Sequence, residues 1–135
     1  MKIKDWVTND LIIKRNTDTI KDLVEMAVKE KISLEDAYLE NTDLKGVDLS
    51  NANLRYAILE DADLSNTDLV GANLRYAILR DVNLRGADLR DADLENADLR
   101  GADLRGTNLE NTNLEDANLE GANIDKNNDC LNNSK

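Results

Sequence analysis

The stretch NLRYAILED, at residues 53–61, recurs with one change as NLRYAILRD at residues 73–81. Around it, every fifth residue from Leu39 to Ile124 is aliphatic, and these eighteen positions hold seventeen Leu and one Ile. Two residues before each of them stands Ala, Thr or Val. A period of five fits neither a helix, which advances about 100° per residue, nor a strand, whose side chains alternate between faces. The chain is therefore predicted to turn equally every five residues.

Equal turns wind a chain into a polygonal coil. In an extended segment, residues two apart point to the same side, so the small residue and the Leu face inward. The echo after twenty residues predicts four pentapeptides per coil, with layers hydrogen-bonded about 4.8 Å apart. The predicted fold is an all-β solenoid, a four-sided parallel β-helix of about 4.5 coils and about 22 Å in length. Its core is represented by the column Leu39, Leu59, Leu79, Leu99 and Leu119.

The individual units carry a family resemblance. ADLEN, ADLRG, ANLRY and ADLRD resemble the A(D/N)LXX consensus of pentapeptide repeat proteins. The resemblance implies a right-handed quadrilateral β-helix in which the Asp or Asn before each Leu orders the corners. Some members of that family bind DNA gyrase as rod-shaped mimics of duplex DNA, which implies a topoisomerase-modulating function as an alternative. This sequence departs from those members, because its central positions are Leu where theirs are often Phe and its rod is short.

The two ends of the repeat differ. Residues 1–36 are predicted to form an N-terminal cap, with a hairpin at 2–14 that turns around residues 8–10 and an amphipathic helix at 18–31. The repeat is predicted at 37–126, followed by a polar tail at 127–135 that contains no amphipathic helix. A solenoid needs its open ends covered. We therefore expect self-association through the C-terminal end, as a homodimer.

Composition limits the classes of function. The chain has 17 basic and 28 acidic residues and a net charge of −11, which disfavours direct binding to nucleic acid or to an anionic membrane. It has no His, no apolar run of membrane-spanning length, and no nucleophile or calcium-repeat motif. The single Cys130 fits a reducing compartment. These features predict a cytoplasmic protein that is not an enzyme and uses no cofactor or metal.

An outward apolar stripe is the first candidate site. Tyr38, Ile58 and Ile78 take the position before the central Leu, where Asp or Asn otherwise stands, and Tyr56 and Tyr76 flank them. The twenty-residue spacing places these residues on one wall. One interpretation is that part of the N-terminal segment, such as Trp6 or Ile12, packs over this stripe. The other is a surface for a partner protein or a second copy.

A basic patch is the second candidate site. The residue after the central Leu is arginine at five neighbouring positions, namely Arg80, Arg85, Arg90, Arg100 and Arg105. Acidic columns that include Asp88, Asp98 and Asp103 run beside them, so solvated ion pairs are one expectation and contact with phosphate or an acidic protein is the other. The sequence as a whole predicts a non-enzymatic scaffold or protein-interaction module with an unidentified protein partner, gyrase binding being the alternative.

Overall fold

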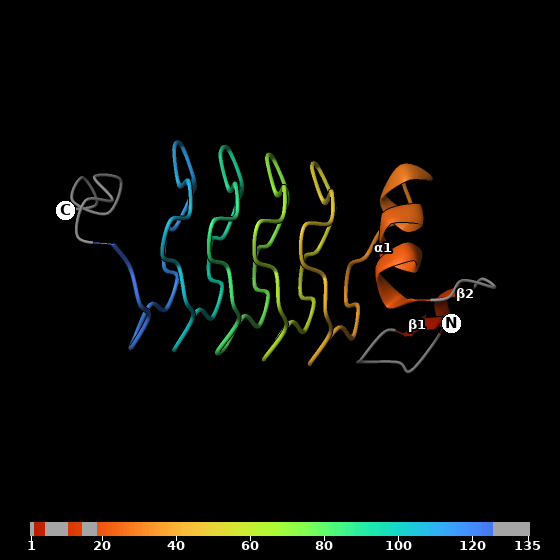
Figure 1. The fold of residues 1–135 in the computed structure, drawn as a ribbon, viewed down its shortest axis with the longest axis horizontal. Coiled ribbons are helices and arrows are strands. Elements are labelled where there is room, and N and C mark those ends of the chain that lie inside the picture. Colours follow the sequence, from red (N-terminus) through yellow and green to blue (C-terminus); the bar gives the residue numbers. More distant parts are fainter. Residues whose placement is uncertain (1, 5–10, 15–18, 126–135) are drawn as a thin grey trace.

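The structure is a computed structural model, and it describes residues 2–4, 11–14 and 19–125. Two short strands, β1 (Lys2–Lys4) and β2 (Leu11–Lys14), precede one helix, α1 (Ile20–Lys29). From there the chain winds into coils that stack side by side along the long axis of the molecule, with α1 at one end and the last coil at the other (Figure 1). None of the described residues form a helix long and apolar enough to cross a membrane.

The corners of the coil have a uniform backbone conformation. At every corner from Leu44 to Leu119 the Leu carbonyl accepts a hydrogen bond from the N–H three residues later, as between Leu54 and Ala57 at 3.0 Å. At Leu39 the hydroxyl of Thr42 donates to the carbonyl at 2.6 Å. Every fifth residue from Asp36 to Gly121 has a positive φ, which is the pattern of a type II turn. Apart from Tyr56 and Tyr76, this column holds only Asn, Asp and Gly, the residues that adopt such a conformation at low cost.

A parallel ladder joins successive coils. Each bridge pairs residues twenty apart, from Tyr38 with Ile58 to Asp103 with Asn123. Within the ladder, the N–H of Leu59 donates to the carbonyl of Ile78 at 2.8 Å. Four pentapeptides therefore complete one turn of the coil. The ladder reaches back to Leu34, whose N–H donates to the carbonyl of Asn53 at 2.9 Å.

The lumen of the coil is filled by the period-five Leu and by the small residues beside them. Leu39, Leu59, Leu79 and Leu99 are fully buried, whereas Leu119, in the last coil, is only partly buried. Thr67 and Thr107 stand at small-residue positions, and their hydroxyls donate to the carbonyls of Leu44 and Leu84 in the preceding coil, at 3.1 and 2.9 Å. The buried hydroxyls are thereby satisfied.

The N-terminal elements lie at the other end of the rod. Helix α1 begins after a capping box between Thr19 and Asp22 and is shorter than the predicted span of 18–31. Its residues Leu23, Val24 and Ala27 belong to the same buried cluster as the first Leu of the coil. Strands β1 and β2 pair antiparallel, and the Lys4 carbonyl accepts from the N–H of Tyr38 at 2.8 Å. The predicted turn at residues 8–10 lies outside the described residues.

Leu79→Ala tests how much a buried Leu of the lumen contributes to the stability of the fold. Because Leu79 is fully buried, we expect the substitution to lower the free energy of unfolding by about 2 to 5 kcal/mol, measured by denaturant titration. Leu119→Ala is the matched control, and its effect should be clearly smaller because that side chain is partly exposed. Equal effects of the two substitutions would contradict this distribution of the core.

Candidate interaction surface

Side-chain oxygens support most corners of the coil. The residue before the central Leu is usually Asp or Asn, and its oxygen accepts a hydrogen bond from the backbone N–H two residues later. Asp63 accepts from Ser65 at 2.9 Å, and Asn83 accepts from Arg85 at 3.2 Å. These are Asx-type turns, in which a short polar side chain satisfies the backbone locally.

The apolar stripe omits this support. Tyr38, Ile58 and Ile78 occupy the Asx position, and the bridges Tyr38–Ile58 and Ile58–Ile78 stack them directly on one wall. An isoleucine side chain has no oxygen to offer, so the corners after Ile58 and Ile78 lack the side-chain acceptor that the other corners use. The same column continues as Asp98 and Asn118 in the next coils. The stripe is therefore confined to the N-terminal half of the rod.

Tyr56 and Tyr76 stand at the corner position that has a positive φ, with φ of 59° in both. A bulky side chain rarely adopts this conformation, and it carries a conformational cost of order 1 to 3 kcal/mol. The two rings stack with centroids 5.1 Å apart and an interplanar angle of 21°. Arg55 lies 4.6 Å above the Tyr56 ring and donates to its hydroxyl at 3.0 Å. Stacking and the cation–π contact partly offset the backbone cost.

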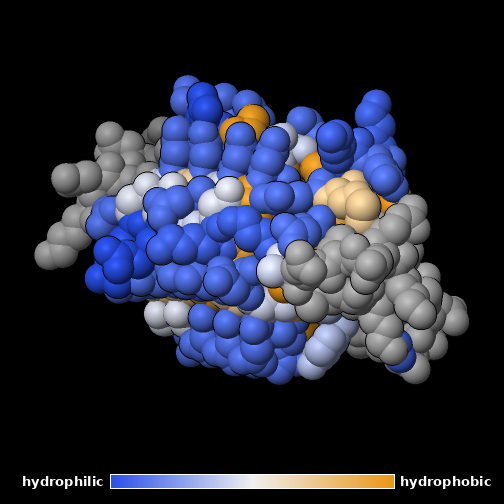
Figure 2. Space-filling model, turned by 45° about the vertical axis from the view of Figure 1, so that its right-hand side comes forward, coloured by the Kyte–Doolittle hydropathy of each residue, from blue (hydrophilic) through white to orange (hydrophobic). Residues whose placement is uncertain are grey.

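The stripe is accessible to different degrees along its length. Tyr38 is 48% exposed and Tyr76 is 37% exposed, while Tyr56, Ile58 and Ile78 are half-buried. The Tyr38 hydroxyl is hydrogen-bonded to Glu40, and this bond raises the pKa of Tyr38. Trp6 and Ile12 were the residues suggested to pack over the stripe. Trp6 and the Ile12 side chain lie outside what the structure describes. The face of the rod in Figure 2 is mostly hydrophilic, with apolar colour limited to separate spots.

The basic patch is largely paired with carboxylates. Arg80 and Arg100 both contact Asp98, at 2.6 and 2.8 Å. Their hydrogen bonds, that of Arg100 first, hold the pKa of Asp98 well below its usual range. Arg90 pairs with Asp88 at 2.6 Å, and Arg105 pairs with Asp103 at 2.5 Å. Arg85 is the exception, because within the described part of the chain no ion pair involves it.

Sequence reasoning missed two features of this surface. The positive-φ column was visible as a run of Asn, Asp and Gly at every fifth position, in which Tyr56 and Tyr76 stand out. The exceptional state of Arg85 was also visible, because Asn83 stands two residues before it. At Arg90, Arg100 and Arg105 that place holds the Asp with which the arginine pairs. Residues 2–4, 11–14 and 19–125 contain no cluster of three or more metal-ligating side chains.

Comparison with known proteins identifies the family of the chain. A family model of pentapeptide repeats matches residues 32–69, 67–106 and 102–128, and the chain belongs to the pentapeptide repeat family. Proteins of this family form right-handed β-helices and are typically structural or interaction modules. A comparison with curated proteins found no match.

Two cyanobacterial crystal structures resemble the rod. Rfr23, a pentapeptide repeat protein from Cyanothece 51142, is 48% identical over 67% of this chain and 58% of that chain, with a TM-score of 0.55. HetL, a pentapeptide repeat protein involved in heterocyst differentiation regulation in Nostoc sp. strain PCC 7120, is 42% identical over 63% of this chain and 39% of that chain, with a TM-score of 0.62. The chain thus covers less than two thirds of either relative.

A third solved structure has a more distant relationship. QnrB1, a plasmid-mediated fluoroquinolone resistance protein, is 23% identical over 73% of this chain and 65% of that chain, with a TM-score of 0.35. A likeness of this size does not support a shared function.

Acid titration tests the ion pairs. Hydrogen bonds lower the pKa of Asp88, Asp98 and Asp103, chiefly those from Arg90, Arg100 and Arg105. A lowered pKa in the folded state stabilises the fold above about pH 4, the unfolded value, and this stabilisation is lost as the pH falls further. We expect a melting temperature that is level near neutral pH and drops below about pH 4.

Asp98→Asn identifies the contribution of the best-paired carboxylate. Asparagine keeps the corner hydrogen bond but loses both arginine ion pairs, so we expect a loss of about 1 kcal/mol or less at neutral pH and a smaller drop in acid. Asp68→Asn is the control, because no ion pair involves Asp68 within the described residues. Identical acid profiles for the wild type and Asp98→Asn would contradict this assignment.

Proposed function

We propose that the chain is a non-enzymatic protein-interaction module, in which a β-helical rod of about 4.5 coils presents the Tyr/Ile stripe to a protein partner. One observation carries the proposal: all five stripe residues depart from the local pattern that stabilises this fold. Three of them replace an Asx residue, and two place a tyrosine where φ is positive. Residues that break local consistency are expected at functional sites, where a surface is kept for a purpose other than stability.

The chemistry of the stripe suits a protein surface. It combines aliphatic and aromatic side chains with Arg55 and Arg75, and both arginines also contact carboxylates of the rod, Glu35 at 3.6 Å and Asp93 at 3.3 Å. Tyrosine and arginine are the residue types that are enriched in the energetically dominant parts of protein interfaces. The rod holds these side chains in a fixed register, so a partner would meet a surface that needs little reordering.

The double substitution Ile58→Asn with Ile78→Asn separates binding from folding. Asparagine is one of the two usual residues at this position, and it restores the side-chain acceptor for the corner without adding a charge. The gained hydrogen bonds should therefore offset the lost contact area, and we expect the free energy of unfolding to change by less than about 1 kcal/mol per site. Affinity capture from the source cells, followed by mass spectrometry, should show a partner bound by the wild type and lost by this variant.

Val70→Asn is the matched control for that experiment. It removes a partly buried apolar side chain from a different wall, so the partner should remain bound. A partner retained equally by the wild type, the double variant and Val70→Asn would refute the stripe as its binding site.

Modulation of DNA gyrase by mimicry of duplex DNA is the second candidate. Its support in this chain is the net charge of −11. Inhibition of gyrase supercoiling by the purified chain would favour this candidate. Absence of gyrase binding at micromolar concentration would exclude it.

We also infer roles for the two ends of the rod. At the N-terminal end, β1 and α1 are proposed to cap the coil, supported by the burial of Ile3 and Leu23 and by the bond from Tyr38 to Lys4. At the other end, Leu114, Leu119 and Ile124 are only partly buried. Apolar side chains on the last coil favour contact with a second copy of the chain, and we propose a homodimer through the C-terminal end.

Light scattering on the full chain and on a version that ends at Asp125 tests the proposed dimer. We expect a solution mass of about twice 15.1 kDa for the full chain. Leu119→Asp should shift the mass to that of a monomer, because a charge on the last coil opposes stacking of two copies. A monomeric full chain at high protein concentration would exclude the dimer.

A further inference from the structure

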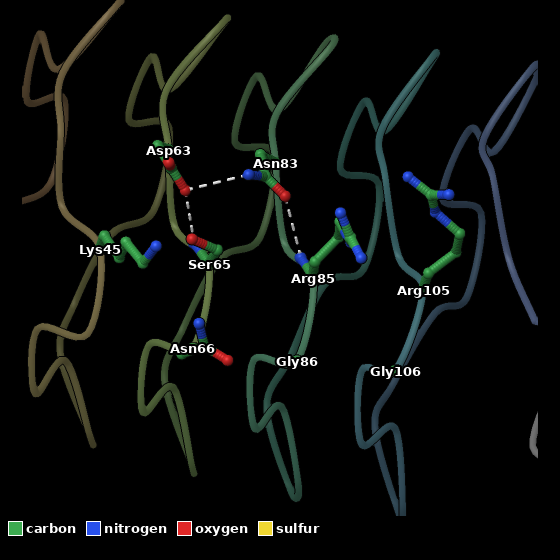
Figure 3. Close-up of a pocket in the computed structure, with 9 residues that line it drawn as sticks. All are labelled: Lys45, Asp63, Ser65, Asn66, Asn83, Arg85, Gly86, Arg105 and Gly106. Carbon is green, nitrogen blue, oxygen red and sulfur yellow. Dashed lines mark hydrogen bonds between the residues drawn. The ribbon is translucent and has the colours of Figure 1, made fainter.

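A polar groove runs along a different wall of the rod from the stripe. It encloses about 400 Å³ and is lined by Lys45, Ser65, Arg85 and Arg105, with Asp63 and Asn83 along one side and Asn66, Gly86 and Gly106 along the other. Figure 3 shows the first four in one row across successive coils. On this wall, the two columns after the central Leu contain no carboxylate from Lys45 to Gly106, and the next residue of the first column is Asp125, whose carboxylate accepts from the N–H of Gly106 at 2.6 Å. This pattern is unusual in a chain with a net charge of −11.

Glycine occupies two corners along one edge of the groove. Gly86 and Gly106 both have positive φ and add no side chain of their own to this edge. The Asn66 side chain lies against Gly86, where an added Cβ would fall 2.6 Å from its Oδ1, and the Asp125 carboxylate accepts from the N–H of Gly106.

The cations of the groove differ in their pairing. Asp103 holds Arg105 at 2.5 Å, whereas no ion pair in the described part of the chain involves Lys45 or Arg85. Arg85 makes no such ion pair because Asn83 takes the place that Asp103 has relative to Arg105. At longer range the carboxylate of Asp103 attracts Arg85, and that of Asp63 attracts Lys45. The Asn83 amide instead donates to Asp63 at 3.1 Å, and its oxygen accepts from the backbone N–H of Arg85 at 3.2 Å. Two cations thus stand two coils apart, about 9.6 Å by the usual spacing of paired strands.

The negative charge of Asp63 restricts which anionic ligands the groove can bind. Its carboxylate lies in the coil between those of the two cations and accepts a hydrogen bond from the backbone N–H of Ser65 at 2.9 Å. Hydrogen bonding to Ser65 lowers the pKa of Asp63. An anion centred above Ser65 would be repelled by this charge, so a compact ligand such as phosphate is disfavoured. In the polyproline II conformation a peptide has three residues per turn and advances about 3.1 Å per residue, so acidic side chains three residues apart lie on one face, span about 9 Å and reach both cations.

We propose that this groove binds an acidic peptide segment, with one carboxylate on Lys45 and a second, three residues along, on the guanidinium of Arg85. Arginine presents a planar fork that matches a carboxylate in a bidentate manner. Asn66 lies beside the row and offers an amide to the peptide backbone. The site does not depend on the Tyr/Ile stripe, because it lies on another wall and uses none of its residues.

The test is a titration of the ¹⁵N-labelled full chain with a blocked peptide that carries two aspartates three residues apart among glycine and serine, followed by NMR. We expect shift changes at the amides of Ser65, Asn66 and Gly86, and none when both aspartates are replaced by asparagine. Asn83→Asp supplies the missing partner of Arg85 and keeps the corner hydrogen bond, but it replaces the hydrogen bond to Asp63 with a second carboxylate. It should weaken peptide binding about tenfold, and thermal unfolding of this variant checks that the fold is retained. Arg85→Gln should weaken it to a similar extent.

Asn73→Asp is the matched control. It makes the same change in charge before Arg75 on another wall, so peptide affinity should stay within about twofold of the wild type. Ile58→Asn with Ile78→Asn should also leave peptide affinity unchanged, which distinguishes a failure of this site from a failure of the proposed stripe.

Three results would overturn the site. The first is the absence of shift changes at about millimolar peptide and low salt. The second is an equal loss of affinity in Asn83→Asp and Asn73→Asp, which would indicate a general charge effect. The third is binding of inorganic phosphate at the same amides as tightly as the peptide, which would show a single-anion site instead of one for two carboxylates.

Discussion

At each corner of the coil, the backbone passes through a residue with positive φ and returns at once to the extended ladder. Because this happens every five residues without exception from Asp36 to Gly121, the Leu side chains always face the lumen and the ladder always pairs residues twenty apart. The outward surface inherits the same register, so a side chain and its equivalents in other coils form straight columns. Any surface property of the rod is therefore set by four or five residues that are far apart in sequence.

The local repeat explains why much of the fold could be predicted from the sequence. The Leu period requires a turn every five residues, and the echo of Tyr56 and Ile58 at Tyr76 and Ile78 gives four turns per coil. Handedness has no such signature in the spacing and rests on the family. The ends were harder to predict, because Leu34 and Leu119 obey the same period as the middle of the rod but have different neighbours. The five-residue period alone does not indicate which Leu lie in the end coils and are therefore less buried.

The candidate sites show where counting residue types fails. Five arginines at equivalent positions predicted one basic patch. Whether each guanidinium is paired with a carboxylate, however, depends on the residue two places earlier and on the neighbouring coil. Asp98 stands two places before Arg100 and one coil from Arg80, so it holds both. Asn83 offers Arg85 no carboxylate, so Arg85 makes no ion pair with any residue that the structure describes. Lys45 entered no prediction, because it becomes a neighbour of Arg85 only through the stacking of coils.

The acidity of the rod is explained by how the coil is built, without reference to function. Asp residues support the corners through hydrogen bonds to backbone N–H groups, so an acidic surface follows from the way the coil is built. The net charge therefore discriminates poorly between an interaction module and a mimic of duplex DNA. Departures from the corner pattern discriminate better, since each forgoes a local stabilising contact. In this chain they are the tyrosines and isoleucines of the stripe. The groove at Arg85 keeps the corner pattern and differs only in its charge, because Asn83 supports the corner without a carboxylate. A partner that contacts both surfaces would bind two adjacent walls of the same rod.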